Sequence, residues 1–143
     1  MEQVRANATL ARATLILRAT LGVFLLQWAV EKFVVPQNTV AIWGYFYGLD
    51  VSQSLAYVLG TIELALAACL FLGAWRKWAY GAALALHAVS VIVSWRQLID
   101  PWSNPANHLF IAGVPVLGAL GALFLLRDFD RGVFAGPNDK PRD

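Results

Sequence analysis

The chain has 143 residues, of which 59% are hydrophobic and 14% charged, and its formal net charge is +2. With a mean hydropathy of +0.58, this composition lies outside the usual range of soluble proteins and indicates one membrane domain. The basic residues form no Lys/Arg-rich stripe, so the sequence predicts no nucleic-acid partner. Because Cys69 is the single cysteine, an intrachain disulfide, a CxxC redox pair and a cysteine-based zinc site are excluded.

The amino-terminal region does not follow the pattern of a cleaved signal peptide. Arg5, Arg12 and Arg18 are spread through the approach to the first apolar run, and no small-residue cleavage site closes a short apolar core. A helical span needs about 20 mostly apolar residues. We therefore predict a retained first span over residues 13–35, which Pro36 ends.

The segment 36–51 is too short to cross a membrane, and it is rich in aromatic residues. Such side chains are typical of the lipid headgroup level. We predict a short interfacial or re-entrant helix here, broken at Gly44 and Gly48. Its aromatic residues are Trp43, Tyr45, Phe46 and Tyr47.

Three further apolar runs complete the predicted fold class, which is an all-α integral membrane four-helix bundle in a single domain, 1–143. Ser52 is a suitable N-cap for the second span, and Gly73 is a suitable residue to close it. The predicted later spans and the charged tail cover residues 52–72, 78–98, 106–126 and 127–143.

Small residues and a proline are concentrated in the last span. Gly113, Gly118 and Gly121 predict close helix packing, and Pro115 predicts a kink. A nucleotide-binding loop is excluded, because no strand precedes these glycines and no lysine follows at the required offset.

The distribution of basic residues predicts the orientation of the chain in the membrane. One side of a four-span arrangement has only Lys32 and Arg96, and the opposite side carries most of the other basic residues. The positive-inside rule then predicts a multi-pass protein of the bacterial inner membrane with both termini in the cytoplasm. The basic residues of that cytoplasmic side are Arg5, Arg12, Arg76, Lys77, Arg127, Arg131, Lys140 and Arg142.

Three ionisable residues fall inside the predicted spans, namely Arg18, Glu63 and His87. Such residues are costly in a bilayer and usually face the bundle interior with a partner. One interpretation is structural: Glu63 pairs with Arg18 or hydrogen-bonds His87. The alternative is a proton-handling group beside a bound quinone-like molecule, where a buried carboxylate exchanges protons.

A second group of polar and aromatic residues is predicted on the outer face. It forms either an ordinary membrane collar, or a docking surface or the polar mouth of a ligand cavity. The chain turns at Asp100 and Pro101 between the third and fourth spans. The candidate partner or ligand residues are Gln27, Glu31, Lys32, Trp95, Arg96, Asp100, Trp102, Asn107 and His108.

Metal and haem sites are not predicted. His87 and His108 differ in expected depth by about 10 Å or more at the helical rise per residue, which argues against a haem held by both. Glu63 and His87 alone are too few ligands for a closed metal site. No intrinsic cofactor is expected, although a bound quinone stays an alternative.

Several short motifs over residues 12–126 resemble the DoxX/DoxD-like family of small four-helix membrane proteins. They are R-A-T-L-G-V-F at residues 18–24, E-K-F at 31–33, F-Y-G-L at 46–49 and G-T-I-E-L-A-L at 60–66, with Gly73 closing that helix. The resemblance implies a place beside respiratory chemistry. One branch of the family is similar to the membrane subunit of a thiosulfate:quinone oxidoreductase.

These observations predict an integral-membrane accessory subunit of a larger redox or energy-converting complex, in contact with other membrane subunits. A quinone-accessible site lined by this subunit is an open alternative. The enzymatic alternative is a quinone-reducing subunit in which Glu63 and His87, with Arg18, manage protons. A lesser alternative is an oligomeric transporter of a small solute, which needs several copies because four spans line little by themselves. A homo-oligomer is compatible with each of these hypotheses.

Overall fold

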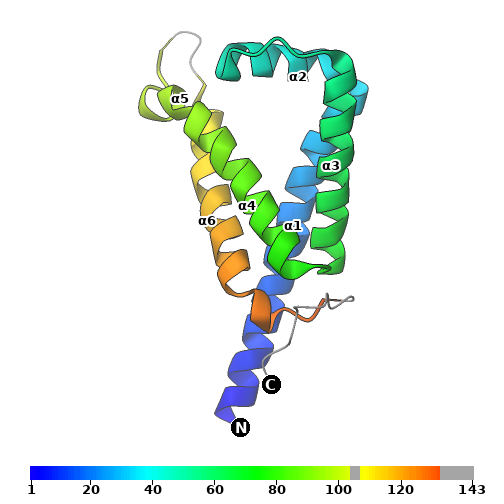
Figure 1. Cartoon of the computed structure of the whole chain (residues 1–143). Helices are drawn as coiled ribbons and strands as arrows, with labels where there is room; N and C mark the ends of the chain where they lie inside the picture. Colours follow the sequence, from blue (N-terminus) through cyan, green and yellow to red (C-terminus); the bar gives the residue numbers. More distant parts are fainter. Residues whose placement is uncertain (104–106, 133–143) are drawn as a thin grey trace.

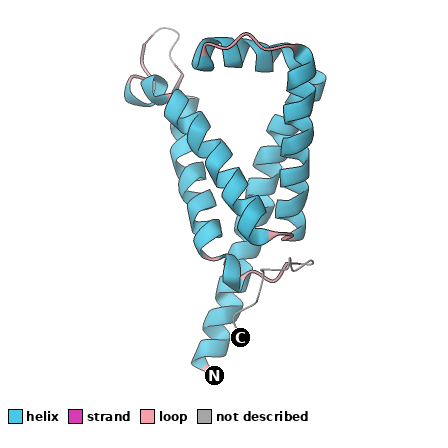
Figure 2. Cartoon of the chain, viewed as in Figure 1, coloured by secondary structure: helices cyan, strands magenta, loops and turns pink. Residues whose placement is uncertain are grey.

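The computed structural model describes residues 1–103 and 107–132, and every regular element in these ranges is helical. Figure 2 shows this helical architecture, which agrees with the predicted all-α class. The start of the predicted 106–126 span and residues 133–143 of the predicted tail lie outside the described residues.

The first helix, α1, covers Glu2–Val34 and starts well before the predicted boundary at residue 13. Residues 2–12 are mostly good helix formers, so the helix continues back through the basic approach to the apolar run. At the other end Val35 has an extended φ of −135°, as expected for a residue before proline, and Pro36 starts the next helix.

The predicted short helix between the first two long helices exists as α2, Pro36–Ile42, followed by one turn of π-helix, η1, Trp43–Tyr47. The predicted break at Gly48 is confirmed, and this residue ends the segment in the left-handed conformation with φ 65°. The predicted break at Gly44 is wrong, because the helical hydrogen bonding continues through that residue. In Figure 1 this segment lies crosswise over one end of the long helices.

The helix α3 covers Gln53–Leu72, and both of its predicted end signals are confirmed. The Ser52 side chain accepts a hydrogen bond from the Leu55 N–H at 3.3 Å. Gly73 adopts φ 62° after the last turn, and its N–H is bonded back to the helix.

The predicted third span is divided into α4, Arg76–Val93, and α5, Trp95–Ile99. At the break the Ser94 hydroxyl donates to the Ser90 carbonyl at 2.8 Å. Serine side chains that bond back to the preceding turn compete with the helix and bend it. The prediction of one continuous helix over 78–98 is therefore wrong at this point.

The chain then forms a 3-10 helix, η2, His108–Ala112, which leads into α6, Gly113–Leu125. Pro115 lies in the first turn of α6, so it marks this change of helix type and not a kink within a long helix. A second short 3-10 helix, η3, Arg127–Phe129, follows.

Two extensive helix pairs, α1 with α3 and α4 with α6, make up the body of the molecule. Figure 1 shows that the pairs converge at the end near η3 and diverge toward the end with α2 and α5. The shared core lies toward the convergent end. Its most buried large side chains are Leu21, Leu25, Leu70, Tyr80, Leu120 and Leu123.

The glycines of α6 differ in their surroundings. A Cβ at Gly113 would lie 3.3 Å from Val91, so this glycine allows the close approach of α4, as predicted. Gly118 and Gly121 have open space where a side chain would stand. The prediction that they pack against another helix is therefore wrong within this chain.

Three helical stretches within the described residues are long and apolar enough to cross a membrane. The helix α4 is not one of them, since Arg76 and Lys77 begin it and His87 interrupts its apolar run. Three of the four predicted spans thus have the expected length and composition. The three stretches are Glu2–Val34, Gln53–Leu72 and His108–Leu125.

Gly73→Ala should destabilise the fold, because the residue has φ 62° and its Cβ would meet the Gly132 Cα at 2.6 Å. We expect a loss of about 1–3 kcal/mol or more in the free energy of unfolding. The measurement is chemical unfolding in detergent, with Gly118→Ala as the matched control because its Cβ meets open space. Equal stability of the two variants would contradict the close contact between residues 73 and 132.

Candidate functional site

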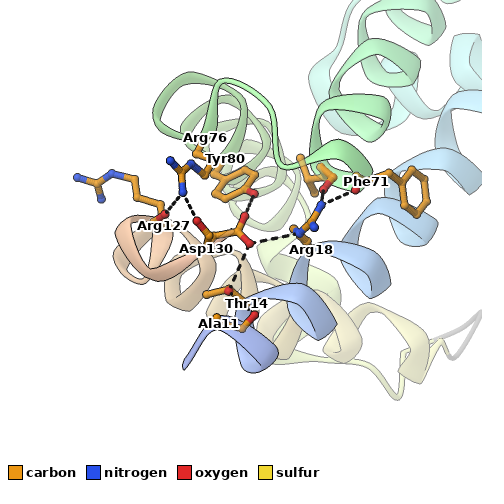
Figure 3. Close-up of polar contacts among 9 residues, drawn as sticks. Ala11, Thr14, Arg18, Phe71, Arg76, Tyr80, Arg127 and Asp130 are labelled. Carbon is orange, nitrogen blue, oxygen red and sulfur yellow. Dashed lines mark hydrogen bonds and ion pairs between the residues drawn. The ribbon is translucent and has the colours of Figure 1, made fainter. Parts of the chain in front are cut away.

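The most concentrated group of buried polar side chains lies where the two helix pairs converge. We call it the Asp130 cluster, and Figure 3 shows that its members come from α1, α4 and the segment after η3 and surround one carboxylate. Each member is at most 6% exposed. The cluster consists of Thr14, Arg18, Arg76, Tyr80 and Asp130.

Both oxygens of the Asp130 carboxylate are engaged. The Tyr80 hydroxyl donates to Oδ2. On the other side, Oδ1 accepts from the Thr14 hydroxyl at 3.4 Å and lies 3.3 Å from Nε of Arg18. A carboxylate that is 98% buried needs such partners, since an unpaired buried charge is strongly unfavourable.

Arg18 joins the cluster to the end of α3. Its guanidinium donates to the carbonyl of Leu70 at 3.2 Å and also to the carbonyl of Phe71. The last carbonyls of a helix have no partner within the helix and carry partial negative charge, so they attract a cation. One side chain thus binds a carboxylate and a helix end together.

Arg76 performs a similar role from the start of α4, but toward backbone groups. Its guanidinium donates to the Arg127 carbonyl at 3.3 Å and to the carbonyl of Asp130. The segment of residues 127–130 is therefore held through its backbone by Arg76 and through the Asp130 side chain by three further residues.

Arg18 lies in the bundle interior, as predicted, but its predicted partner is wrong, and the other members of the Asp130 cluster were not predicted. A signal was present in the spacing. Thr14 and Arg18 are four residues apart on α1, and Arg76 and Tyr80 are four apart on α4, so each pair lies on one helix face. Two such polar faces predict a shared counter-charge, which Asp130 supplies.

Glu63 pairs with neither of its two predicted partners. Its Oε2 accepts from Nζ of Lys32 at 2.8 Å, and both side chains are 10% exposed. The ammonium also donates to the Trp28 carbonyl at 3.3 Å. The predicted pairing of Glu63 with Arg18 or His87 is therefore wrong. Arg18 is paired with Asp130, and Lys32 forms the ion pair with Glu63.

The Lys32–Glu63 pair depends on close contact between α1 and α3. A Cβ at Gly60 would lie 2.9 Å from the Lys32 Cβ and 2.9 Å from the Phe33 ring. Glycine at position 60 therefore lets the two helices approach closely enough for the ion pair to be buried.

His87 is buried on α4 and faces α6 and α1. Its Nε2 lies 2.9 Å from the Gly113 carbonyl oxygen, and because a carbonyl accepts, this nitrogen carries a proton. Its ring meets the Phe24 ring edge-on, with the ring centroids 5.3 Å apart. Glu63 and His87 thus have separate partners and no contact with each other that would make them one proton-handling pair.

The predicted outer surface is divided in the structure. Glu31 accepts from Asn38 at 2.8 Å beside the end of α1. The α5 region lies on the opposite side of the same end of the molecule (Figure 1). Lys32 is not part of this surface, because it is buried in an ion pair with Glu63. The exposed members are Gln27, Trp95, Arg96, Asp100, Trp102, Asn107 and His108.

Local contacts account for several of these exposed residues. Trp102 and His108 stack edge-on with centroids 6.3 Å apart, and the Arg96 guanidinium lies 5.5 Å from the Trp95 ring centroid. The Asn107 side chain caps η2 by accepting from the Leu109 N–H at 3.0 Å. The functional role assigned to this surface stays a prediction.

The contacts of the Asp130 cluster give it a structural role, which is to hold helices together. Within residues 1–103 and 107–132, no three or more His, Cys, Asp or Glu side chains gather as metal ligands would. Both Asp130 oxygens are engaged, so this carboxylate is not placed as a general base for a substrate. The arrangement joins α1, α3, α4 and the segment after α6.

Asp130→Asn should destabilise the protein strongly, because it leaves Arg18 buried without its counter-charge. We expect a loss of about 3–5 kcal/mol, the usual result of removing one partner of a buried ion pair. Thermal unfolding in detergent measures this loss.

The matched control is Asp100→Asn, at an exposed aspartate of the same chain. It should change the free energy of unfolding by no more than about 0.5 kcal/mol. If both variants unfold at the same temperature, the Asp130 cluster does not hold the helices together.

Residues 10–104 match the family of the methylamine utilisation protein MauE, and because this stretch covers most of the chain, the chain belongs to that family. No curated protein and no solved structure matches the chain.

The proposed resemblance to the DoxX/DoxD-like family is wrong, because the matching family is a different one and no DoxX family matches. The motifs that suggested it describe helix packing more than chemistry. Gly60, for example, lies in one of these motifs and allows the contact between α1 and α3. Such packing motifs are common to small helical membrane proteins.

Proposed function

We propose that this member of the MauE family is a multi-pass membrane accessory protein of a methylamine-utilisation system, which holds partner proteins and does not itself transform a substrate. The family match over residues 10–104 is the observation that carries this proposal. The matched stretch contains α3, most of α1, and α4 with α5.

The buried ion pairs support the non-catalytic part of the proposal. Arg18 with Asp130 and Lys32 with Glu63 connect helices, and each charge is neutralised within its pair. The quinone-reducing alternative required Glu63 to act together with His87, and their separate partners give it no geometric support.

The proposal includes a four-span topology in which α4 crosses beside α6, with both termini in the cytoplasm. The extensive packing of α4 on α6 supports α4 as a further span, which makes four in all, since its neighbour is apolar enough to cross. Its two basic residues, Arg76 and Lys77, then lie at the cytoplasmic boundary, where they are favoured.

Single-cysteine labelling tests this topology in a Cys69→Ala background. Ser103→Cys should react with a membrane-impermeant maleimide in intact spheroplasts, because residue 103 follows α5 on the outer side. Lys77→Cys should react only after permeabilisation. Labelling of both positions from the same side would show that α4 does not cross.

Growth on methylamine tests the proposed function. Deletion of the gene from its native host should abolish growth on methylamine as sole nitrogen source and leave growth on ammonium unchanged. The tagged chain, solubilised gently, should retain other proteins of the methylamine-utilisation system. Unchanged growth on methylamine would refute the proposal.

Complementation of the deletion strain then distinguishes a structural role of Glu63 from a catalytic one. Lys32→Met with Glu63→Met replaces the ion pair by apolar groups of similar volume, a change that is often neutral for stability. We expect this double variant to restore growth, whereas Glu63→Met alone leaves Lys32 buried without a partner and lowers the protein level. A double variant that folds but does not restore growth would favour a chemical role for Glu63.

A further inference from the structure

The convergent end of the molecule carries exposed basic and aromatic side chains around the Asp130 cluster. We propose that this surface, which we call the basic collar, binds the headgroups of anionic phospholipids. The proposal rests on the membrane placement given above but not on the methylamine role. The basic collar consists of Arg12, Trp75, Lys77, Trp78 and Arg131.

The fold brings these residues together from three parts of the chain. Gly132 lies against Gly73, where a Cβ on either residue would clash with the backbone of the other, so Arg131 is next to the turn that begins α4. Thr14 is hydrogen-bonded to Asp130 and fixes this turn of α1, and Arg12 extends from another face of the same turn. The Asp130 cluster thus fixes the positions from which the collar side chains extend.

The two tryptophans of the collar are held toward the surface. Trp75 is the one non-glycine residue with positive φ among residues 1–103 and 107–132, at 44°. Trp75 is 60% exposed and Trp78 is 68% exposed. The Lys77 ammonium lies 5.6 Å from the centroid of the Trp78 ring.

The charge of this surface is complementary to an anion. Arg12, Lys77 and Arg131 are exposed. Of the nearby acidic groups, Asp130 is buried and Asp128 lies 4.0 Å from Arg127. Among the described residues of this end, the negative charge is therefore largely paired within the protein, and the exposed charge is positive.

The opposite end of the molecule has the reverse balance. Among the described residues of that end, Asp50 and Asp100 are exposed and Glu31 is partly exposed, against one exposed cation, Arg96. An anionic ligand is thus favoured at one end only. Anionic lipids give the cytoplasmic leaflet a negative surface potential, to which basic residues near the membrane are attracted.

A phospholipid fits the collar better than a soluble phosphate does. Exposed tryptophans prefer the boundary between headgroups and acyl chains. A lysine beside such a ring places its charge at the phosphate while its carbon stem stays in the apolar layer. A soluble anion satisfies the basic groups but gives the two exposed rings no apolar partner.

The test uses the full chain in nanodiscs of phosphatidylcholine, with and without phosphatidylglycerol. Native mass spectrometry should show phosphatidylglycerol retained about tenfold over phosphatidylcholine, and the melting temperature should rise when it is present. Lys77→Gln with Arg131→Gln should remove both effects, and because both residues are exposed, the variant should fold.

The chain supplies a matched control at its other end, where Arg96 lies over Trp95 much as Lys77 lies over Trp78. Arg96→Gln should keep the lipid preference. Equal retention of the two lipids, or an equal loss in both variants, would overturn the proposal. Stabilisation by inorganic phosphate in pure phosphatidylcholine would also overturn it, because the ligand would then be a simple anion.

This experiment is independent of the growth assay. A chain that prefers phosphatidylglycerol but is dispensable on methylamine supports the collar and refutes the proposed function. A chain needed for growth with no lipid preference gives the opposite result.

Discussion

The buried Asp130 carboxylate is the group on which the arrangement of the long helices depends. It is 2% exposed and receives hydrogen bonds or charge from α1 and α4, while Arg18 extends the network to the last carbonyls of α3. A charge in such a place is stable only with its complete set of partners. The convergent end is therefore specified cooperatively, since losing one member leaves the others buried and unpaired.

At the opposite end, the described residues join the two helix pairs by an aromatic contact and a hydrogen bond. The Phe46 ring of η1 meets the Phe110 ring of η2 with centroids 5.6 Å apart, and the Gln97 side chain reaches the Tyr45 hydroxyl at 3.4 Å. Between the two ends, the Lys32–Glu63 pair holds α1 to α3 but not to the other pair. The molecule thus has ion-paired connections at one end and mainly aromatic ones between the helix pairs at the other.

Local signals allowed the sequence to predict much of the fold. Ser52 and Gly73 bound α3 as predicted because caps depend on the backbone of a few adjacent residues. The partners of the buried charges were not predictable in the same way. The predicted depths treat Ser52 and Lys32 as lying at the same outer level, whereas Lys32 lies beside Gly60, well inside α3 and about one turn from Glu63.

Asp130 illustrates a harder limit, because it lies in a charged segment where Asp128 and Arg131 are near neighbours and no periodicity marks it as buried. It also lies beyond the family match, which ends at residue 104. Arg18 and Arg76, however, lie within that match and bond to Asp130. In this chain the family-matched part therefore contains two buried cations whose partner comes from outside it, so α6 and η3 complete the fold and do not merely extend it.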